Sequence, residues 1–173
     1  MSQLQIVVMG VSGCGKSSVG KKLASEMGAR FIDGDDLHPK TNREKMAAGI
    51  PLNDDDREPW LELVGRALAG AANPVDVFEV VKPTGTVVAC SALKRKYREQ
   101  ILRLAPNTQF VHLHGSPQLL ESRMKSREGH FMKAEMLKSQ LDTLEPLEAD
   151  EPGKVYDVAL PVEQIVKQVL ADN

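Results

Sequence analysis

The chain has 173 residues and a mass of 19.0 kDa, which is enough for one domain with a buried core. Its formal net charge of -2 argues against general nucleic-acid binding, which usually needs a basic surplus. No apolar run approaches the roughly 20 residues of a membrane span, and two cysteines, Cys14 and Cys90, are too few for a disulfide framework. We therefore expect a cytoplasmic protein with neither a nucleic-acid nor a membrane partner.

Short apolar, β-branched runs alternate with helical patterns along the chain. Strands are predicted at 4–9, 29–33, 85–91, 108–115 and 154–160, and helices at 16–27, 40–48, 57–71, 93–104, 116–128, 134–145 and 162–171. Gly28 can end the first helix, and Asn53 or one of the three acids after it can cap the third. Such alternation is typical of parallel strands joined by helical crossovers. We predict a single α/β domain over 1–173, a five-stranded parallel sheet with helices on both faces. Ligands should bind beyond the carboxyl ends of its strands.

A glycine-rich loop, "GVSGCGKS", joins the first strand to the first helix and completes the pattern G-x-x-x-x-G-K-[ST]. Glycines let backbone N–H groups approach phosphate oxygens closely, and the helix adds its positive N-terminal end. In such a loop Lys16 reaches the β- and γ-phosphates and Ser17 binds Mg²⁺. The predicted ligands are ATP and Mg²⁺. The predicted nucleotide-binding residues in this loop are Gly10, Val11, Ser12, Gly13, Cys14, Gly15, Lys16, Ser17 and Ser18.

The thiol of Cys14 lies inside this loop, beside Lys16 and at a helix N-terminus. Both neighbours favour a thiolate, so one hypothesis is a lowered pKa for Cys14 and faster reaction with alkylating or oxidising agents than for Cys90. The alternative is that Cys14 is a small residue that stands where serine would serve equally well.

A regulatory nucleotide switch would share the glycine-rich loop, but the guanine-reading pattern N-K-x-D is absent from the chain. One D-x-x-G pattern, Asp150 to Gly153, is predicted to be a turn before the last strand. His112 and His114 alternate on one strand face without a third residue spaced as a metal ligand, so we interpret them as structural. A switch remains a weak alternative to an enzyme.

Two acids, Asp33 and Asp35, follow the second predicted strand in "FIDGDDLHP". Their spacing around Gly34 allows both carboxylates to project toward one side. In phosphoryl transfer Asp33 would help to hold Mg²⁺, and Asp35 would accept the proton of the attacking hydroxyl. The alternative interpretation is a pair of acids in a polar turn.

Four blocks cover almost the whole chain and resemble those of the gluconokinases: "GVSGCGKSSVG", "FIDGDDLHPKTNREKMAAGIPLNDDDREPWL", "ACSALKRKYREQILR" and "SRMKSREGHFMKAEMLKSQLDTLEPLEADE". Gluconokinases are small ATP-dependent kinases of D-gluconate, close in fold to shikimate kinase and the nucleoside monophosphate kinases. The resemblance implies transfer of the ATP γ-phosphate to the 6-hydroxyl of gluconate, with Mg²⁺. It also implies a substrate-binding helical segment at about 38–72 and a lid at about 123–135. A kinase of a shikimate-like acid is the runner-up, and the oligomeric state stays open, a homodimer included.

Gluconate carries one carboxylate and a row of hydroxyls, so its pocket needs cations together with donors and acceptors. The residues of the matching blocks that would bind it are Asp35, His38, Arg43, Arg57, Ser91 and Lys94. An ion pair with the neighbouring acids 54–56 is the alternative role of Arg57. Arg123 and Arg127 lie four residues apart in the lid, on one helical face. The resemblance implies that Arg123 lies on the adenine side and Arg127 at the transferring phosphate.

Overall fold

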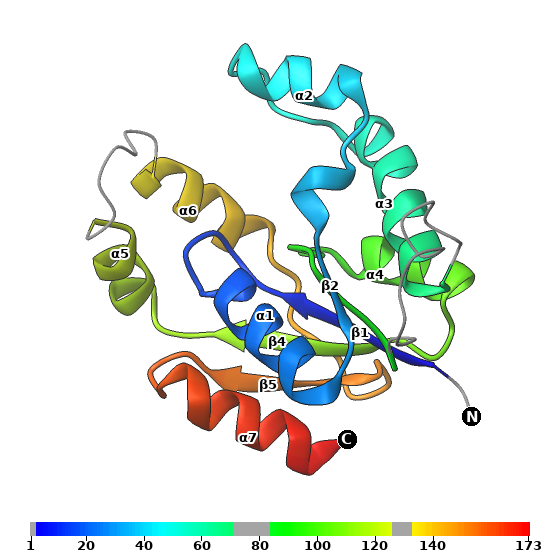
Figure 1. The fold of residues 1–173 in the computed structure, drawn as a ribbon. Coiled ribbons are helices and arrows are strands. Elements are labelled where there is room, and N and C mark those ends of the chain that lie inside the picture. Colours follow the sequence, from blue (N-terminus) through cyan, green and yellow to red (C-terminus); the bar gives the residue numbers. More distant parts are fainter. Residues whose placement is uncertain (1–2, 71–83, 126–132) are drawn as a thin grey trace.

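A computed structural model describes residues 3–70, 84–125 and 133–173 of the chain. Its centre is a five-stranded sheet with the strand order β2-β3-β1-β4-β5, in which every neighbouring pair is parallel (Figure 1). The strands are β1 Leu4–Met9, β2 Arg30–Asp33, β3 Gly85–Ala89, β4 Gln109–His114 and β5 Gly153–Asp157. The helices are α1 Lys16–Met27, a 3-10 turn η1 Gly34–Leu37, α2 Lys40–Ala47, α3 Asp54–Leu68, α4 Arg95–Leu104, α5 Pro117–Lys125, α6 Lys133–Thr143 and α7 Val162–Asp172.

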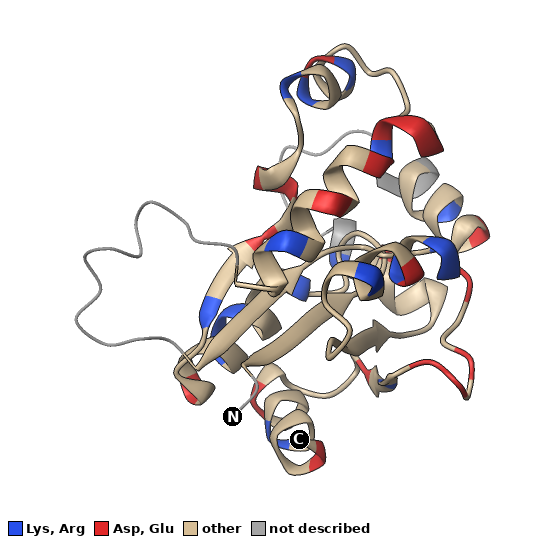
Figure 2. Ribbon diagram, turned by 90° about the vertical axis from the view of Figure 1, so that its right-hand side faces the viewer, with Lys and Arg blue, Asp and Glu red and all other residues tan. Residues whose placement is uncertain are grey.

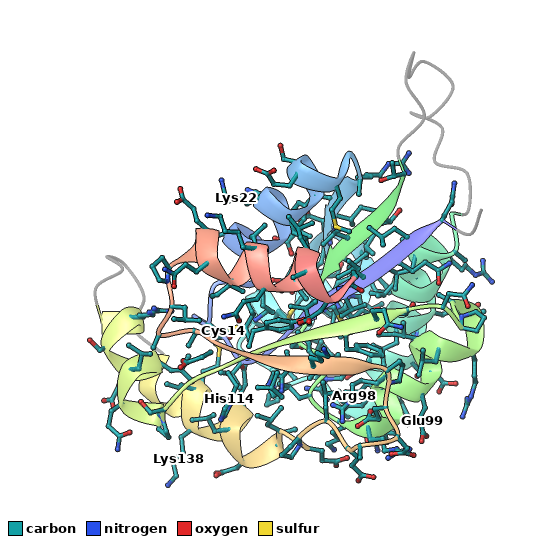
Figure 3. The ribbon with its side chains drawn as sticks, turned by 90° about the horizontal axis from the view of Figure 1, so that it is seen from below. Cys14, Lys22, Arg98, Glu99, His114 and Lys138 are labelled. Carbon is teal, nitrogen blue, oxygen red and sulfur yellow. The ribbon has the colours of Figure 1, made fainter. Side chains whose placement is uncertain are left out.

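Helices cover both faces of the sheet, which explains why the inner strands are continuous apolar runs. Alternate residues of β1 belong to two separate cores. Ile6 and Val8 pack in the core that α1 and α7 share, and Val7 and Met9 pack in the core formed with α3 and α4. Viewed from below, α1 and α7 lie together on one side of the sheet (Figure 3). The predicted fold class is confirmed.

Acidic and basic residues both occur along the helices in the view of Figure 2, in keeping with the small net charge of -2. Among the residues that the structure describes, no helix has both the length and the apolarity to cross a membrane.

Several predicted element ends differ from the structure by one to three residues, and at two of them side chains cap the backbone. Helix α3 begins at Asp54, one turn before the predicted position 57. Asn53 Oδ1 accepts a hydrogen bond from Asp56 N at 2.8 Å, and Asp56 Oδ2 accepts one from Asn53 N at 3.0 Å. This capping box fixes the start of the helix. Strand β5 ends at Asp157 rather than 160, where the Asp157 carboxylate accepts the N–H of Ala159 at 2.8 Å and turns the chain.

Candidate active site

The glycine-rich loop connects β1 to α1 at the carboxyl end of the central strand. Gly10, Gly13 and Gly15 all have positive φ angles, of 144°, 80° and 96°. A Cβ atom on Gly10 would lie 2.7 Å from the carbonyl oxygen of Leu113, so the loop can turn here only without a side chain. No side chain caps the first turn of α1, and its N–H groups therefore stay available to an anion.

Lys16 folds its side chain back over the start of this loop. Its Nζ donates hydrogen bonds to the carbonyl oxygens of Gly10 and Val11, each at 3.0 Å. The amine therefore lies above the first residues of the loop, where a lysine in this motif reaches the β- and γ-phosphates of a bound nucleotide.

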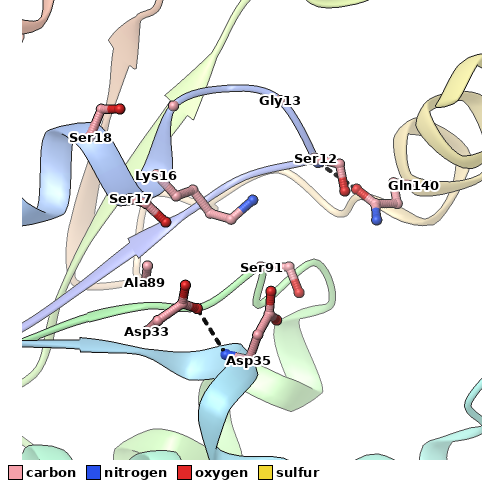
Figure 4. A pocket seen from close by; sticks show the side chains of 11 residues that line it. Ser12, Gly13, Lys16, Ser17, Ser18, Asp33, Asp35, Ala89, Ser91 and Gln140 are labelled. Carbon is pink, nitrogen blue, oxygen red and sulfur yellow. Dashed lines mark hydrogen bonds between the residues drawn. The ribbon is translucent and has the colours of Figure 1, made fainter. Parts of the chain in front are cut away.

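A cavity of about 390 Å³ lies in front of the loop, where the carboxyl ends of β1, β2 and β3 meet (Figure 4). Its lining residues are Ser12, Gly13, Gly15, Lys16, Ser17, Ser18, Asp33, Asp35, Ala89, Ser91 and Gln140. Asp33 Oδ1 accepts a hydrogen bond from Asp35 N at 3.0 Å, so the two acids share one tight turn. The structure thus brings together the predicted phosphate loop, both predicted acids and Ser91.

The carboxyl group of Asp35 has a raised pKa. Burial is the main cause and the nearby charge of Asp33 adds to it, while the positive charges of Lys16 and His38 oppose the shift. A higher pKa makes Asp35 a stronger base than an ordinary aspartate, which suits proton acceptance.

A second cavity, of about 360 Å³, lies on the other side of the loop. It is lined by Gly13, Cys14, Gly15, Ser18, Val19, Arg123, Leu160, Pro161, Val162 and Ile165. Arg123 also donates a hydrogen bond to the carbonyl oxygen of Val158. The mainly apolar wall beside the phosphate loop is compatible with an adenine ring. Arg127 and most of the predicted lid, residues 126–132, lie outside the described residues.

Two predicted substrate residues, His38 and Arg43, lie just outside the cavity lining and shape the turn that carries Asp35. The ring of His38 stacks on Trp60 with centroids 4.3 Å apart. Burial lowers the pKa of His38 despite the opposing charge of Asp35. Arg43 donates to the carbonyl oxygens of His38 at 3.1 Å and Asp36 at 2.5 Å.

The other two, Arg57 and Lys94, gather around Asp54 at the start of α3. Arg57 NH1 is 3.9 Å and Lys94 Nζ 3.7 Å from Asp54 Oδ1. Hydrogen bonds from Lys96 and Tyr97 lower the pKa of Asp54 to about 2. The ion pair that the sequence offered as the alternative role of Arg57 is therefore present.

The hypothesis of a lowered pKa for Cys14 is wrong. Cys14 is 2% exposed, and burial raises the pKa of its thiol more than the charge of Lys16 lowers it. The Cys14 sulfur lies close to Gly10, since a Cβ atom on Gly10 would be 2.8 Å from it. Cys90 is buried as well, with its pKa raised to about 12.

Two contacts at the site escaped the sequence analysis. Gln140 Oε1 accepts a hydrogen bond from the backbone N–H of Ser12 at 2.6 Å, and Trp60 Nε1 donates to the carbonyl oxygen of Gly34 at 2.8 Å. Each pair is far apart in the sequence. Trp60 and Gln140 lie within blocks that resemble the gluconokinases, but nothing in those blocks indicates which residues they contact. Only the fold brings these residues together.

The oxygen donors that line the cavity suit Mg²⁺ better than a metal ion that needs three or more protein ligands. Across the described ranges no three His, Cys, Asp or Glu side chains are placed to hold a metal ion. Mg²⁺ usually keeps several waters and binds one or two carboxylates together with phosphate oxygens. Ser17 and Asp33, which line the same cavity, match that requirement.

Comparisons with known proteins agree with this geometry. A family model described as an AAA domain matches residues 6–147. The chain is 45% identical to the thermoresistant gluconokinase of Escherichia coli (strain K12) over 95% of this chain and 90% of that protein. It is 48% identical to the gluconokinase of Gluconobacter oxydans (strain 621H), covering 97% of this chain and 92% of the relative.

Solved structures give the same result. A crystal structure of a gluconokinase from Sinorhizobium meliloti 1021 superposes with a TM-score of 0.82 at 47% identity, over 98% of this chain and 90% of that one. Shikimate kinase from Aquifex aeolicus shares the fold alone, with a TM-score of 0.57 at 15% identity over 98% of this chain and 95% of that one. A phosphate loop in front of two acids, on a chain with these relatives, confirms the resemblance seen in the sequence: the chain belongs to the gluconokinase family, and it is a P-loop kinase that binds ATP.

Proposed function

We propose that this protein transfers the γ-phosphoryl group of ATP to the 6-hydroxyl of D-gluconate, giving 6-phosphogluconate. One observation carries the proposal. A single cavity joins Lys16 and Ser17 of the phosphate loop to Asp35 and Ser91 at the neighbouring strand ends. A nucleotide phosphate and an acceptor hydroxyl could therefore meet in line within it. Relatives named gluconokinases support gluconate as that acceptor.

The nucleotide would lie along the loop with its phosphates on the backbone N–H groups and the N-terminus of α1. Lys16 would exchange its two carbonyl partners for phosphate oxygens. The adenine ring would occupy the cavity that Arg123 lines. Arg127 of the predicted lid would stabilise the charge on the transferring phosphoryl group.

Ser17 and Asp33 would hold Mg²⁺, Ser17 through its hydroxyl and Asp33 through water. The ion would neutralise phosphate charge and orient the β- and γ-phosphate oxygens.

On the acceptor side Asp35 would take the proton of the 6-hydroxyl as that oxygen attacks phosphorus. Its raised pKa favours this role. Ser91 would bind a gluconate hydroxyl. Arg57 and Lys94 would attract the gluconate carboxylate, while His38 and Arg43 would bind it at the turn that follows β2. We also place the reaction in the cytoplasm, where both buried thiols would stay reduced.

A coupled assay of ADP release tests the proposal. The acceptors are gluconate, shikimate, glycerate and nucleoside monophosphates, each at matched concentration with ATP and Mg²⁺. We expect the highest kcat/KM with gluconate. Equal or faster turnover of shikimate would support the runner-up, a kinase of a related acid. ATP hydrolysis that no acceptor accelerates would favour a regulatory switch.

A further inference from the structure

Among the described residues that line the cavity, Gln140 is the one that comes from α6, the helix that begins at the end of the predicted lid. Its half-buried side chain reaches the phosphate loop, where Oε1 accepts the backbone N–H of Ser12 at 2.6 Å. Figure 4 shows this bond at the edge of the cavity, with Lys16, Asp35 and Ser91 on the same side of the loop.

The bond fixes which way the carboxamide points. A backbone N–H can only donate, so the atom facing Ser12 must be the carbonyl oxygen of Gln140. The Nε2 group, with two N–H donors, is then the end that can serve a ligand in the cavity. Gln140 thus occupies the backbone N–H of Ser12 and presents its own Nε2 donor to the cavity in place of that N–H.

The position of Ser12 indicates which phosphate this donor would meet. Lys16 Nζ lies on the carbonyl oxygens of Gly10 and Val11, the residues directly before Ser12. Because the lysine of this motif serves the β- and γ-phosphates, Ser12 lies beside those two phosphates, and the γ-phosphate is the one that must face the acceptor. Asp35 and Ser91, the proposed acceptor side, line the same cavity.

The chain is anchored just after α6, which ends at Thr143, so the end of the helix that carries Gln140 is held in place. The N–H of Glu145 donates to the carbonyl oxygen of Leu93 at 2.7 Å, and Glu145 Oε1 accepts the N–H of Arg95 at 3.1 Å. Helix α6 and the residues directly after it therefore join the phosphate loop to the segment that follows Ser91.

From these contacts we propose that Gln140 binds the γ-phosphate of ATP through Nε2 while Oε1 stays on Ser12, so that the enzyme distinguishes ATP from ADP partly through α6. The inference deepens the proposed function, on which its kinetic part rests.

The test uses two substitutions with different chemistry. Gln140→Met keeps the length of the side chain but removes acceptor and donor. Gln140→Glu keeps the acceptor for Ser12, removes the donor and adds a negative charge. Gln168→Met, on the exposed side of α7, is the matched control. Calorimetric titration with ADP and with a non-hydrolysable ATP analogue measures nucleotide affinity without any acceptor.

Both Gln140 variants should bind the analogue about tenfold more weakly or worse, the usual effect of losing a hydrogen bond to a charged group. ADP affinity should change less than about twofold, the control should match wild type, and kcat with gluconate should fall in both variants. Circular dichroism melting identifies a variant that has lost its fold. In that case the nucleotide affinities of the other Gln140 variant test the proposal.

Tighter analogue binding by Gln140→Met would overturn the proposal, because Gln140 would then compete with phosphate for Ser12. Equal losses of ADP and analogue affinity would also overturn it, since they indicate a loop clamp with no γ-phosphate contact. Selective loss of analogue affinity without gluconate turnover would support Gln140 and count against the acceptor instead.

Discussion

Lys16 holds its positive charge beside the first residues of the phosphate loop, where its Nζ donates hydrogen bonds to the carbonyl oxygens of Gly10 and Val11. Lys16→Ala removes that charge from the β- and γ-phosphates, and we expect kcat to fall by about 10²-fold or more, as for other preorganised transition-state contacts. The coupled ADP assay measures the loss, and Lys167→Ala on the exposed face of α7 is the control. Near wild-type turnover in a folded Lys16→Ala protein would contradict the role given to the phosphate loop.

Asp35 should act as a base rather than as a binding group. Asp35→Asn preserves shape, so ATP binding should persist while kcat falls by about 10² to 10⁴-fold. In the wild type, kcat should decline as pH falls through the pKa of Asp35, which burial and Asp33 raise above 3.8. The acid limb should therefore lie above the usual range of an aspartate, and the variant should lack it. A variant with unchanged kcat and a raised KM for gluconate would show that Asp35 only binds.

Among the helices, α4 holds the segment after β3 through Arg98, which points into the interior while the neighbouring Glu99 lies at the periphery (Figure 3). Arg98 donates to both carboxylate oxygens of Glu151, at 2.6 Å and 3.0 Å, and to the carbonyl oxygens of Ala92 and Leu93 at 2.9 Å and 3.3 Å. Ala92 has a positive φ of 44°, which few side-chain-bearing residues adopt. This pair therefore supports the strained segment next to Ser91.

Breaking that pair should destabilise the protein strongly. Glu151→Gln leaves the buried Arg98 charge uncompensated, and we expect a loss of about 3–5 kcal/mol in the free energy of unfolding, measured with urea. Glu62→Gln, in the exposed pair with Arg66 on α3, is the control and should have little effect.

The loss of unfolding free energy in Glu151→Gln should depend on pH, which gives a second test of the Arg98–Glu151 pair. Burial alone would raise the pKa of Glu151, but hydrogen bonds from Arg98 and from Glu148 N lower it overall. A lowered pKa contributes stability above the unfolded value of 4.5 and loses it as pH falls through the folded value. The gap between wild type and variant should therefore narrow in acid. A gap that widens there would contradict this interpretation.

The elements were largely predictable because local rules govern them. The buried strands are β-branched runs, and α1 spans Lys16–Met27 as predicted because Gly28, with φ 66°, ends it. The start of α3 was predicted one turn too late because Asn53 and three acids could each have capped the helix. Only the structure shows that Asn53 is the cap. The pKa of Cys14 was misjudged because burial, which dominates it, depends on packing from distant parts of the chain.

On the scale of the whole molecule, acid sensitivity should centre on His112 in the middle of the sheet. His112 is 2% exposed, and neither ring nitrogen has a hydrogen-bond partner within the part of the chain that the structure describes. Burial, with the charges of His114 and Arg98, lowers its pKa from 6.5 to about 4. The unfolded chain then binds a proton more readily, so stability should fall by up to about 3 kcal/mol as pH drops from 6.5 to about 4.

Substitution tests this expectation. His112→Leu should flatten the decline of unfolding free energy with falling pH. His114→Leu removes only a smaller contribution to the pKa of His112 than burial makes, so it should flatten the decline far less. Urea unfolding at a series of pH values measures both. An unchanged slope in His112→Leu would place the acid sensitivity elsewhere.

The assembled site was only half predictable. The phosphate loop and the Asp33–Asp35 pair follow from motifs, and strand ends in parallel sheets converge by rule. The strand order β2-β3-β1-β4-β5 does not follow from any local pattern. It is this order that places Asp35 and Ser91 in the same cavity as the phosphate loop. Gln140 and Arg98 matter through contacts that cross 128 and 53 positions of sequence, which no motif encodes.

Trp60 is the single tryptophan of the chain. Its indole N–H holds the carbonyl oxygen of Gly34, between the two acids of the site, and its ring stacks on His38. The intrinsic fluorescence of the protein therefore originates largely at one ring in contact with the turn that carries Asp33 and Asp35. A shift of that turn when an acceptor enters would change the emission, so that rapid-mixing experiments could time the arrival of the sugar acid in unlabelled enzyme, separately from the chemical step.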